Sequence, residues 1–280
     1  MWDNVQIAFV GSGVMAEAMI RGLLTQNVVA PEQIVAAGPR LERGAELQQK
    51  YKVRVTTDNR EAVRGAEVVV LSVKPQVLSG VLSDLRGDIP SPALVLSIVA
   101  GARLALIQRE LDHPYVVRSM PNTPAQIGQG ITVWTASPAV SPEQRERARA
   151  ILKALGEEIF VEDEDYLDMA TALSGTGPAY VFLFIEALVD AGVHLGFPRY
   201  MAERLVLQTV KGSVEYAQRD RHHLAHLRNQ VTSPGGTSAE ALYYLEKAGF
   251  RTAISRAVWA AYQRCVQLGR GKKQSTIEEG

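Results

Sequence analysis

The chain has 280 residues, enough for two domains, and its 30 lysines and arginines are balanced by 30 aspartates and glutamates. This balance excludes the strong net field that would draw the protein to nucleic acid or to an anionic membrane. The lone cysteine, Cys265, excludes an intramolecular disulfide and suits a reducing compartment, so we expect a cytoplasmic protein.

The first predicted element is an apolar strand over residues 5–10, which runs into a glycine-rich turn and then a helix. The turn reads Gly11-Ser12-Gly13-Val14-Met15-Ala16 and matches the G-x-G-x-x-A pattern of dinucleotide-binding folds. Gly11 permits a tight turn, Gly13 lets a pyrophosphate approach the backbone, and small Ala16 allows close helix packing. A glycine turn without a ligand is the alternative, but its position directly after a strand favours a dinucleotide cofactor.

The second predicted strand, residues 34–37, ends at Gly38-Pro39-Arg40. A site for NAD usually has Asp or Glu near this point to bind the ribose 2′-hydroxyl, and neither is present. Arg40 instead offers a cation for a 2′-phosphate, unless it is only a solvated surface charge. The pattern therefore favours NADPH as cofactor, with NADH as the alternative.

Further strands are predicted up to residue 161, with helical patterns between several of them, most clearly over residues 142–155. These strands cover residues 68–73, 94–98, 115–117, 131–135 and 158–161. Near-continuous apolar strands are typical of a sheet covered on both faces, so we predict a doubly wound α/β domain of the Rossmann type over residues 1–163.

Ligands bind such domains at the carboxyl ends of the strands. The candidate segments there are Ser72-Val73-Lys74-Pro75, Val99-Ala100-Gly101 and Ser119-Met120-Pro121-Asn122-Thr123-Pro124. A surface lysine is the alternative interpretation for Lys74.

Strand patterns end near Glu164, and residues 164–280 are predicted to form an all-helical domain. Its helical patterns cover residues 164–173, 179–195, 198–217, 222–230, 238–248 and 250–268, with a break at Gly175-Thr176-Gly177-Pro178. Residues 179–185 are apolar on almost every side, and Glu186 and Asp190 argue against a membrane span. A second subunit is the simplest way to bury so apolar a helix, so we predict a dimerisation domain, followed by a disordered tail from Gly269 to Gly280.

The stretch Ser233-Pro234-Gly235-Gly236-Thr237-Ser238-Ala239-Glu240 combines a loop with a helix start. Thr237 and Glu240, three residues apart, fit a capping box. The glycines let the backbone approach a ligand, and a helix N-terminus favours an anion. We predict that a small carboxylate binds there beside the hydroxyl of Ser238; an ordinary capped loop is the alternative.

Taken in chain order, six motifs resemble those of pyrroline-5-carboxylate reductases: F-V-G-S-G-V-M-A, S-V-K-P, V-A-G, S-M-P-N-T-P, L-S-G-T-G-P-A-Y and S-P-G-G-T-S-A-E-A-L. The resemblance extends from Ile7 to about Leu268; the last three motifs are specific, whereas many reductases share the first. It implies NADPH- or NADH-dependent reduction of L-1-pyrroline-5-carboxylate to L-proline, the last step of proline biosynthesis. Enzymes of this family have helical domains that interlock in dimers, often assembled into decamers.

The resemblance also implies roles for individual residues. The pyrophosphate would lie against Gly11, Ser12, Gly13, Val14 and Met15, and the adenosine would lie near Gly38, Arg40 and Asn59. The nicotinamide side would be lined by Val73, Lys74, Pro75, Val99, Ala100 and Gly101. Backbone groups of Gly236, Thr237 and Ser238 would bind the substrate carboxylate. The Ser238 hydroxyl would act catalytically by hydrogen-bonding the ring nitrogen, and Glu164 would also approach the substrate.

The sequence departs from the family pattern in two places. The family usually has threonine where Ser238 stands. Serine keeps the hydroxyl but lacks the methyl group that fixes the rotamer of threonine. Before the loop, Arg221 replaces an acidic residue and His223 replaces a proline. His222 and His226 are spaced like a metal-binding pair on one helix face, but without a nearby third ligand we predict a solvated helix and no metal site.

The residues that are missing favour an imine substrate. Reduction of a neutral ketone needs a proton donor, usually His or Lys, whereas a cyclic imine can arrive already protonated. Neither His nor Lys occurs in the L-S-G-T-G-P-A-Y or S-P-G-G-T-S segment. A β-hydroxyacid dehydrogenase is the alternative enzyme, but it would carry a catalytic lysine on the helix at residues 179–195, which has none. A regulatory protein that binds the cofactor without turnover is the third interpretation.

Overall fold

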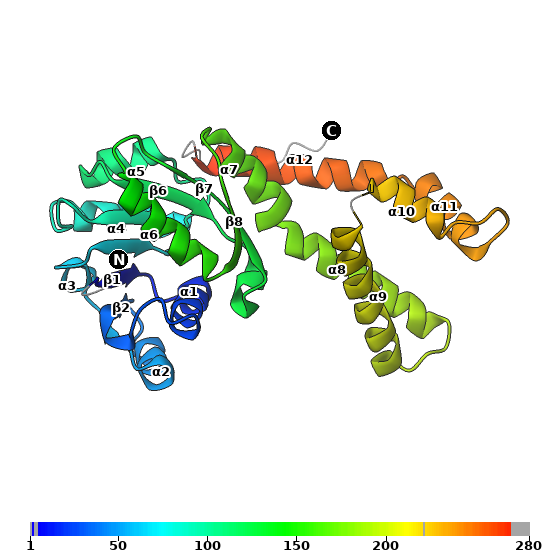
Figure 1. Cartoon of the computed structure of the whole chain (residues 1–280), viewed down its shortest axis with the longest axis horizontal. Helices are drawn as coiled ribbons and strands as arrows, with labels where there is room; N and C mark the ends of the chain where they lie inside the picture. Colours follow the sequence, from blue (N-terminus) through cyan, green and yellow to red (C-terminus); the bar gives the residue numbers. More distant parts are fainter. Residues whose placement is uncertain (1, 3–4, 221, 270–280) are drawn as a thin grey trace. The chain divides into compact units, whose positions relative to one another are not determined.

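The computed structural model of the chain describes residue 2, residues 5–220 and residues 222–269. By packing, the chain forms two compact units: Met1–Thr176 together with Ala261–Gly280, and Gly177–Ala260. The first unit contains the sheet, and the second is helical (Figure 1). Of the predicted disordered tail from Gly269 to Gly280, Gly269 is helical, which contradicts the prediction there, and the rest lies outside the described residues, as does Arg221.

An eight-stranded sheet forms the centre of the first unit, in the order β3-β2-β1-β4-β5-β6-β7-β8. Its strands are β1 (Ile7–Val10), β2 (Ile34–Ala37), β3 (Arg54–Thr56), β4 (Val68–Leu71), β5 (Leu94–Ser97), β6 (Val116–Met120), β7 (Gly130–Ala136) and β8 (Gly156–Phe160). Neighbouring strands pair in parallel except β6 and β7, which are antiparallel. The strand order reverses between β1 and β4, and ligands of doubly wound sheets bind outside the carboxyl ends of the strands at such a point.

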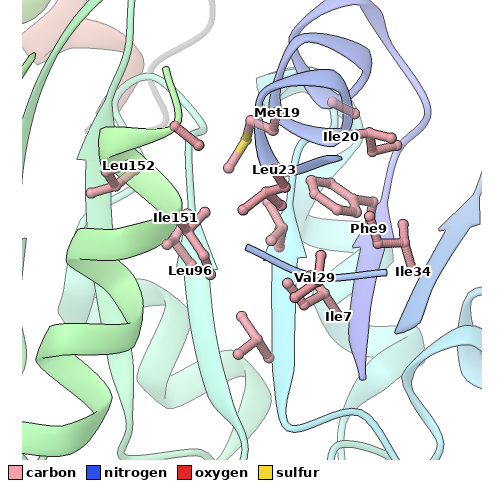
Figure 2. Close-up of a cluster of buried hydrophobic side chains, with 14 of the residues drawn as sticks. Ile7, Phe9, Met19, Ile20, Leu23, Val29, Ile34, Leu96, Ile151 and Leu152 are labelled. Atoms are coloured by element: carbon pink, nitrogen blue, oxygen red, sulfur yellow. The ribbon is translucent and has the colours of Figure 1, made fainter. Parts of the chain in front are cut away.

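Helices cover both faces of this sheet. They are α1 (Val14–Thr25), α2 (Leu41–Tyr51), α3 (Asn59–Val63), α4 (Leu78–Leu85), α5 (Leu104–Leu111) and α6 (Pro142–Lys153). On one face, α1, α2 and α6 pack against alternate strand residues; Figure 2 shows Met19 and Leu23 of α1 near Phe9 of β1. On the other face, α3, α4 and α5 pack against the intervening strand residues. Burial of alternate residues on opposite faces explains why the strands are apolar throughout.

The remainder of the described chain is helical. It contains α7 (Asp165–Ala170), a π-helical turn (Thr171–Gly175), α8 (Gly177–His194), α9 (Arg199–Arg219), α10 (Leu224–Gln230), α11 (Thr237–Lys247) and α12 (Phe250–Gly269). The predicted break at residues 175–178 corresponds to the last residue of this π-helical turn, a bend at Thr176 and the first two residues of α8. Pro178 is the second residue of α8, where its missing N–H removes no helical hydrogen bond.

The predicted fold class is confirmed, with two differences in detail. The three-residue edge strand β3 was not predicted. The boundary between the two compact units falls after Thr176, later than the predicted boundary at residues 163/164. The reason is that α7 and the π-helical turn pack with the unit that contains the sheet. The last part of α12, from Ala261, belongs to that unit as well.

Candidate active site

The glycine-rich turn between β1 and α1 is fixed by contacts with the end of β4. Gly11 has a φ of +103°, and a Cβ there would lie 2.7 Å from the carbonyl oxygen of Ser72. The Ser72 hydroxyl donates a hydrogen bond of 2.7 Å to the carbonyl oxygen of Gly11. The structure thus brings together two of the predicted segments at the point where the strand order reverses.

Gly13 caps α1 in an extended conformation, without a side-chain hydrogen bond. A Cβ on Gly13 would meet no atom within 4 Å, so the turn is open on this side. The Gly13 carbonyl oxygen accepts the N–H of Glu17, and the N–H groups of residues 14–16 therefore have no acceptor within the helix. Because such groups and the helix dipole favour an anion, the open turn fits the predicted pyrophosphate.

The predicted adenosine residues follow the carboxyl ends of β2 and β3, which are neighbours in the sheet. Gly38 is buried, and a Cβ there would lie 2.2 Å from the Oγ of Ser12. Arg40 is exposed at the N-cap of α2, where no side chain caps the helix. Asn59 is partly buried and is the first residue of α3.

Arg43 supports the same turn and was not identified from the sequence. Its Nε donates a hydrogen bond of 3.0 Å to the carbonyl oxygen of Ser12, and its guanidinium group pairs with Glu17. Burial opposes the ionisation of Glu17, but hydrogen bonds from Lys50, Arg43 and Tyr51 lower its pKa to about 2. Glu17 is therefore ionised at neutral pH and links α1 to α2. No local motif marks these contacts, because Glu17 lies 26 to 34 residues from its three partners.

Four of the six predicted nicotinamide residues line a cavity of about 600 Å³, whereas Val73 and Lys74 do not. Pro75 and the loop 99–101 line this cavity, together with side chains of α4 and α5. Gly101 is buried and has a φ of +74°, a conformation that favours glycine. Lys74 is exposed at the start of the 3₁₀ turn Pro75–Val77, which fits a surface lysine as well as a cofactor contact.

Two further motifs meet at the end of β6. A Cβ on Gly175, in the π-helical turn, would lie 2.7 Å from the Cε of Met120. Asn122 fixes the following loop, because its side-chain oxygen accepts the N–H of Ile131 at 3.0 Å. π-Helical turns occur frequently at functional sites. This one includes the start of the L-S-G-T-G-P motif and lies against Met120 of the S-M-P-N-T-P motif.

Glu164 lies in a network of ion pairs. Its Oε1 accepts hydrogen bonds from the Leu104 N–H at 2.8 Å and from Arg118 at 2.9 Å. Arg118 also pairs with Asp168 at 2.5 Å, and Arg103 pairs with Asp168 at 3.3 Å. The sequence implied a role for Glu164 near the substrate but did not indicate these partners.

The predicted substrate loop forms a turn that leads into α11. Gly235 has a φ of +71°, and Gly236 is the N-cap of the helix. The predicted capping box between Thr237 and Glu240 is wrong: Thr237 is the first helical residue, one position too late to cap, and no side chain caps the helix. The Gly236 carbonyl oxygen accepts the N–H groups of Ala239 and Glu240. The N–H groups of Thr237 and Ser238 therefore have no acceptor within the helix, an arrangement that suits a carboxylate better than a capped end would.

The histidines before this loop have local partners. His222 pairs with Asp220, and His226 contacts Gln230 at 3.2 Å. His223, which replaces a proline of the family pattern, caps α10 by accepting the N–H of Ala225 at 3.1 Å. Among the described residues, no group of three or more His, Cys, Asp or Glu is arranged to bind a metal.

Apolar side chains are exposed along α8. Within this helix, all of which is described, only Val189 is buried, whereas Phe182 is 60% and Leu183 is 67% exposed. By length and composition, the segment Asp165–His194 could also cross a membrane. An apolar surface of this kind on a folded chain indicates an interface.

Comparisons with known proteins agree with this arrangement. Residues 164–268 match the family described as pyrroline-5-carboxylate reductase dimerisation, and residues 6–101 match the family described as NADP oxidoreductase coenzyme F420-dependent. The first match covers the whole of the apolar segment at Asp165–His194. It confirms the prediction that the chain forms a homo-oligomer through its helical region.

Individual relatives match almost the whole chain. The pyrroline-5-carboxylate reductase of Synechocystis is 46% identical over 95% of this chain and 99% of its own length. That of Pseudomonas aeruginosa is 42% identical over 94% of this chain and 96% of its own length. The crystal structure of Plasmodium falciparum pyrroline carboxylate reductase with NADP bound has a TM-score of 0.89 at 32% identity, and the match covers 96% of this chain and 100% of that one. The chain therefore belongs to the pyrroline-5-carboxylate reductase family.

Proposed function

We propose that the protein reduces L-1-pyrroline-5-carboxylate to L-proline with NADPH, the last step of proline biosynthesis. The observation that carries this proposal is the start of α11, where the Thr237 and Ser238 N–H groups are available to a carboxylate. The Ser238 hydroxyl is the candidate partner of the ring nitrogen. Oxidation of NADPH with pyrroline-5-carboxylate, with proline identified as the product, tests the function.

The cofactor would be bound by the sheet-containing unit. The open side of Gly13 and the helix start behind it fit the pyrophosphate, and Gly38, Arg40 and Asn59 fit the adenosine ribose and its phosphate. The segments 73–75 and 99–101 would line the nicotinamide, as the resemblance implies. When bound, NADPH supplies a hydride, and the protein's part is to hold the imine and the cofactor in position.

The residues around α11 suit a substrate that needs no acid from the enzyme. A cyclic imine protonated on nitrogen carries its own proton, so the Ser238 hydroxyl need only accept a hydrogen bond from it. Gly236 provides close backbone approach, and Glu164 is the candidate acidic group that the resemblance implies for the substrate. We also propose that the enzyme acts in the cytoplasm, without nucleic-acid or membrane partners, as dimers that assemble into decamers.

Replacing Arg40 with alanine is expected to weaken NADPH binding by about 1–3 kcal/mol, the value of a charge-assisted contact to phosphate, and to leave NADH binding nearly unchanged. Fluorescence titration of each cofactor in the absence of substrate measures both constants. Arg64→Ala serves as the control, because Arg64 is exposed at the C-terminal end of α3, away from the carboxyl edge of the sheet. Equal losses for the two cofactors, or no loss, would remove Arg40 from the 2′-phosphate site.

Replacing Leu183 with glutamate is expected to break the homo-oligomer, because it buries a charge in the apolar interface of α8. Sedimentation velocity should show the mass of a single chain or a concentration-dependent mixture. Leu41→Glu is the matched control, since Leu41 is similarly exposed at 73% but lies outside the dimerisation region. An unchanged mass for Leu183→Glu would place the interface elsewhere.

A further inference from the structure

A buried arginine lies near the carboxyl end of the sheet, outside every motif used above. Arg118, on β6, is 2% exposed. Its two terminal nitrogens donate separately, Nη1 to Glu164 at 2.9 Å and Nη2 to Asp168 at 2.5 Å. A buried guanidinium group is costly unless it is fully paired, and replacing such a network with apolar residues is often neutral for stability. Its presence here therefore calls for a role other than stability.

The network is connected to the start of α5 through a single carboxylate oxygen. Glu164 Oε1, which accepts from Arg118, also accepts the N–H of Leu104 at 2.8 Å. Leu104 is the first residue of α5 and directly follows the loop 98–103. Arg118 thus fixes the far end of this loop through Glu164.

The neighbouring residue of β6 fixes the near end of the same loop. Ser119 is 1% exposed, and its hydroxyl donates to the carbonyl oxygen of Ser97 at 3.1 Å. The Ser97 hydroxyl in turn accepts the N–H of Val99 at 3.2 Å. Two consecutive residues of one strand therefore hold both ends of the loop.

The middle of the loop has little room to move. Gly101 has a positive φ, and a Cβ there would lie 3.0 Å from the backbone nitrogen of Gly269, at the end of α12. A Cβ on Gly269 would lie 2.8 Å from the carbonyl oxygen of Gly101. With both ends held and one side packed, the backbone of residues 99–101 is closely restrained.

We infer that Arg118 and Glu164 are positioning residues for the cofactor: by holding the Leu104 N–H, they fix the loop 99–101 in the conformation that receives the nicotinamide. This inference rests on the proposed function, which assigns that loop to the nicotinamide. It differs from a direct contact between Glu164 and the substrate, because the shared Oε1 of Glu164 is engaged by the protein itself.

A cofactor-binding experiment without substrate distinguishes the positioning role of Glu164 from a direct contact with the substrate. Glu164→Ala removes the acceptor of the Leu104 N–H, and we expect NADPH binding to weaken about tenfold or more. Glu164→Gln keeps a carbonyl oxygen for that N–H and should restore most of the affinity. Glu162→Ala is the control, because Glu162 is an exposed neighbour whose carboxylate accepts no hydrogen bond from the loop 98–103. Its NADPH affinity should match that of the wild type.

Thermal unfolding of each variant shows whether a loss of affinity merely reflects unfolding. Should Glu164→Ala fail to fold, Ser119→Ala tests the other end of the loop, and a severalfold loss of NADPH affinity is expected. Unchanged NADPH affinity in folded Glu164→Ala, with or without a raised KM for the imine, would overturn the inference. A wild-type enzyme that binds NADPH but does not reduce pyrroline-5-carboxylate would contradict the proposed function instead, and the NADPH titrations would still decide the role of Glu164.

Discussion

Gly13→Ala is expected to weaken NADPH binding about a hundredfold or more, because a methyl group on the open side of the turn displaces the pyrophosphate from at least two charge-assisted hydrogen bonds of about 1.5–3 kcal/mol each. The same substitution should leave the folded protein almost as stable as the wild type. The Cβ of the introduced alanine would meet no protein atom within 4 Å, and the φ of Gly13 is −77°, which any residue adopts. Titration with NADPH and thermal unfolding measure the two effects.

Gly11→Ala provides the contrasting variant. Gly11 has a φ of +103°, and its Cβ would lie 2.7 Å from the carbonyl oxygen of Ser72, so this substitution should lower the melting temperature as well as NADPH affinity. Only the pair of results distinguishes a ligand site from a structural turn. Wild-type NADPH affinity in Gly13→Ala would show that the turn is purely structural.

Ser238→Ala is expected to lower kcat/KM for pyrroline-5-carboxylate about ten- to a hundred-and-fifty-fold, because one hydrogen bond to a charged group, worth about 1.5–3 kcal/mol, is lost. NADPH affinity should stay nearly unchanged, since the hydroxyl serves the imine. Steady-state kinetics with the imine, together with NADPH titration, measure both quantities.

Ser238→Thr is the control for this variant. It restores the residue that the family usually has, keeps the hydroxyl, and should retain most of the activity. An alanine variant as active as the wild type would show that the hydroxyl has no chemical role. A loss of NADPH binding in both variants would mean that the loop belongs to the cofactor site.

Most of the fold could be predicted from the sequence, because its elements have strong local patterns. The buried strands are continuous apolar runs, and the glycine-rich turn follows the first of them directly. The strand β3 was missed because its three residues, Arg54 to Thr56, are too short and too exposed to show a pattern. The break at residues 175–178 was predicted because glycine and proline usually end helices. Gly175 instead ends a π-helical turn, and Gly177 and Pro178 are the first two residues of α8.

The loops of the candidate site were predictable, but the contacts that support them were not. Glycine and proline mark a loop from sequence alone, and resemblance to a family adds the roles. The pairing of Arg43 with Glu17 and that of Arg118 with Glu164 join residues 26 and 46 positions apart, and only the folded sheet brings them together. The capping box failed for a local reason: α11 begins at Thr237, so Gly236 occupies the cap position.

The measurement that tests the central claim most directly is NADPH oxidation by the purified protein with pyrroline-5-carboxylate and, in parallel, with the oxo-acid counterparts of a panel of 2- and 3-hydroxy acids. Our account predicts rapid oxidation with the cyclic imine, formation of proline in equal amount, and negligible rates with the oxo acids, because no Lys or His occurs in the substrate motifs to protonate a carbonyl oxygen. Faster turnover of an oxo acid than of the imine, or no oxidation with either, would contradict it.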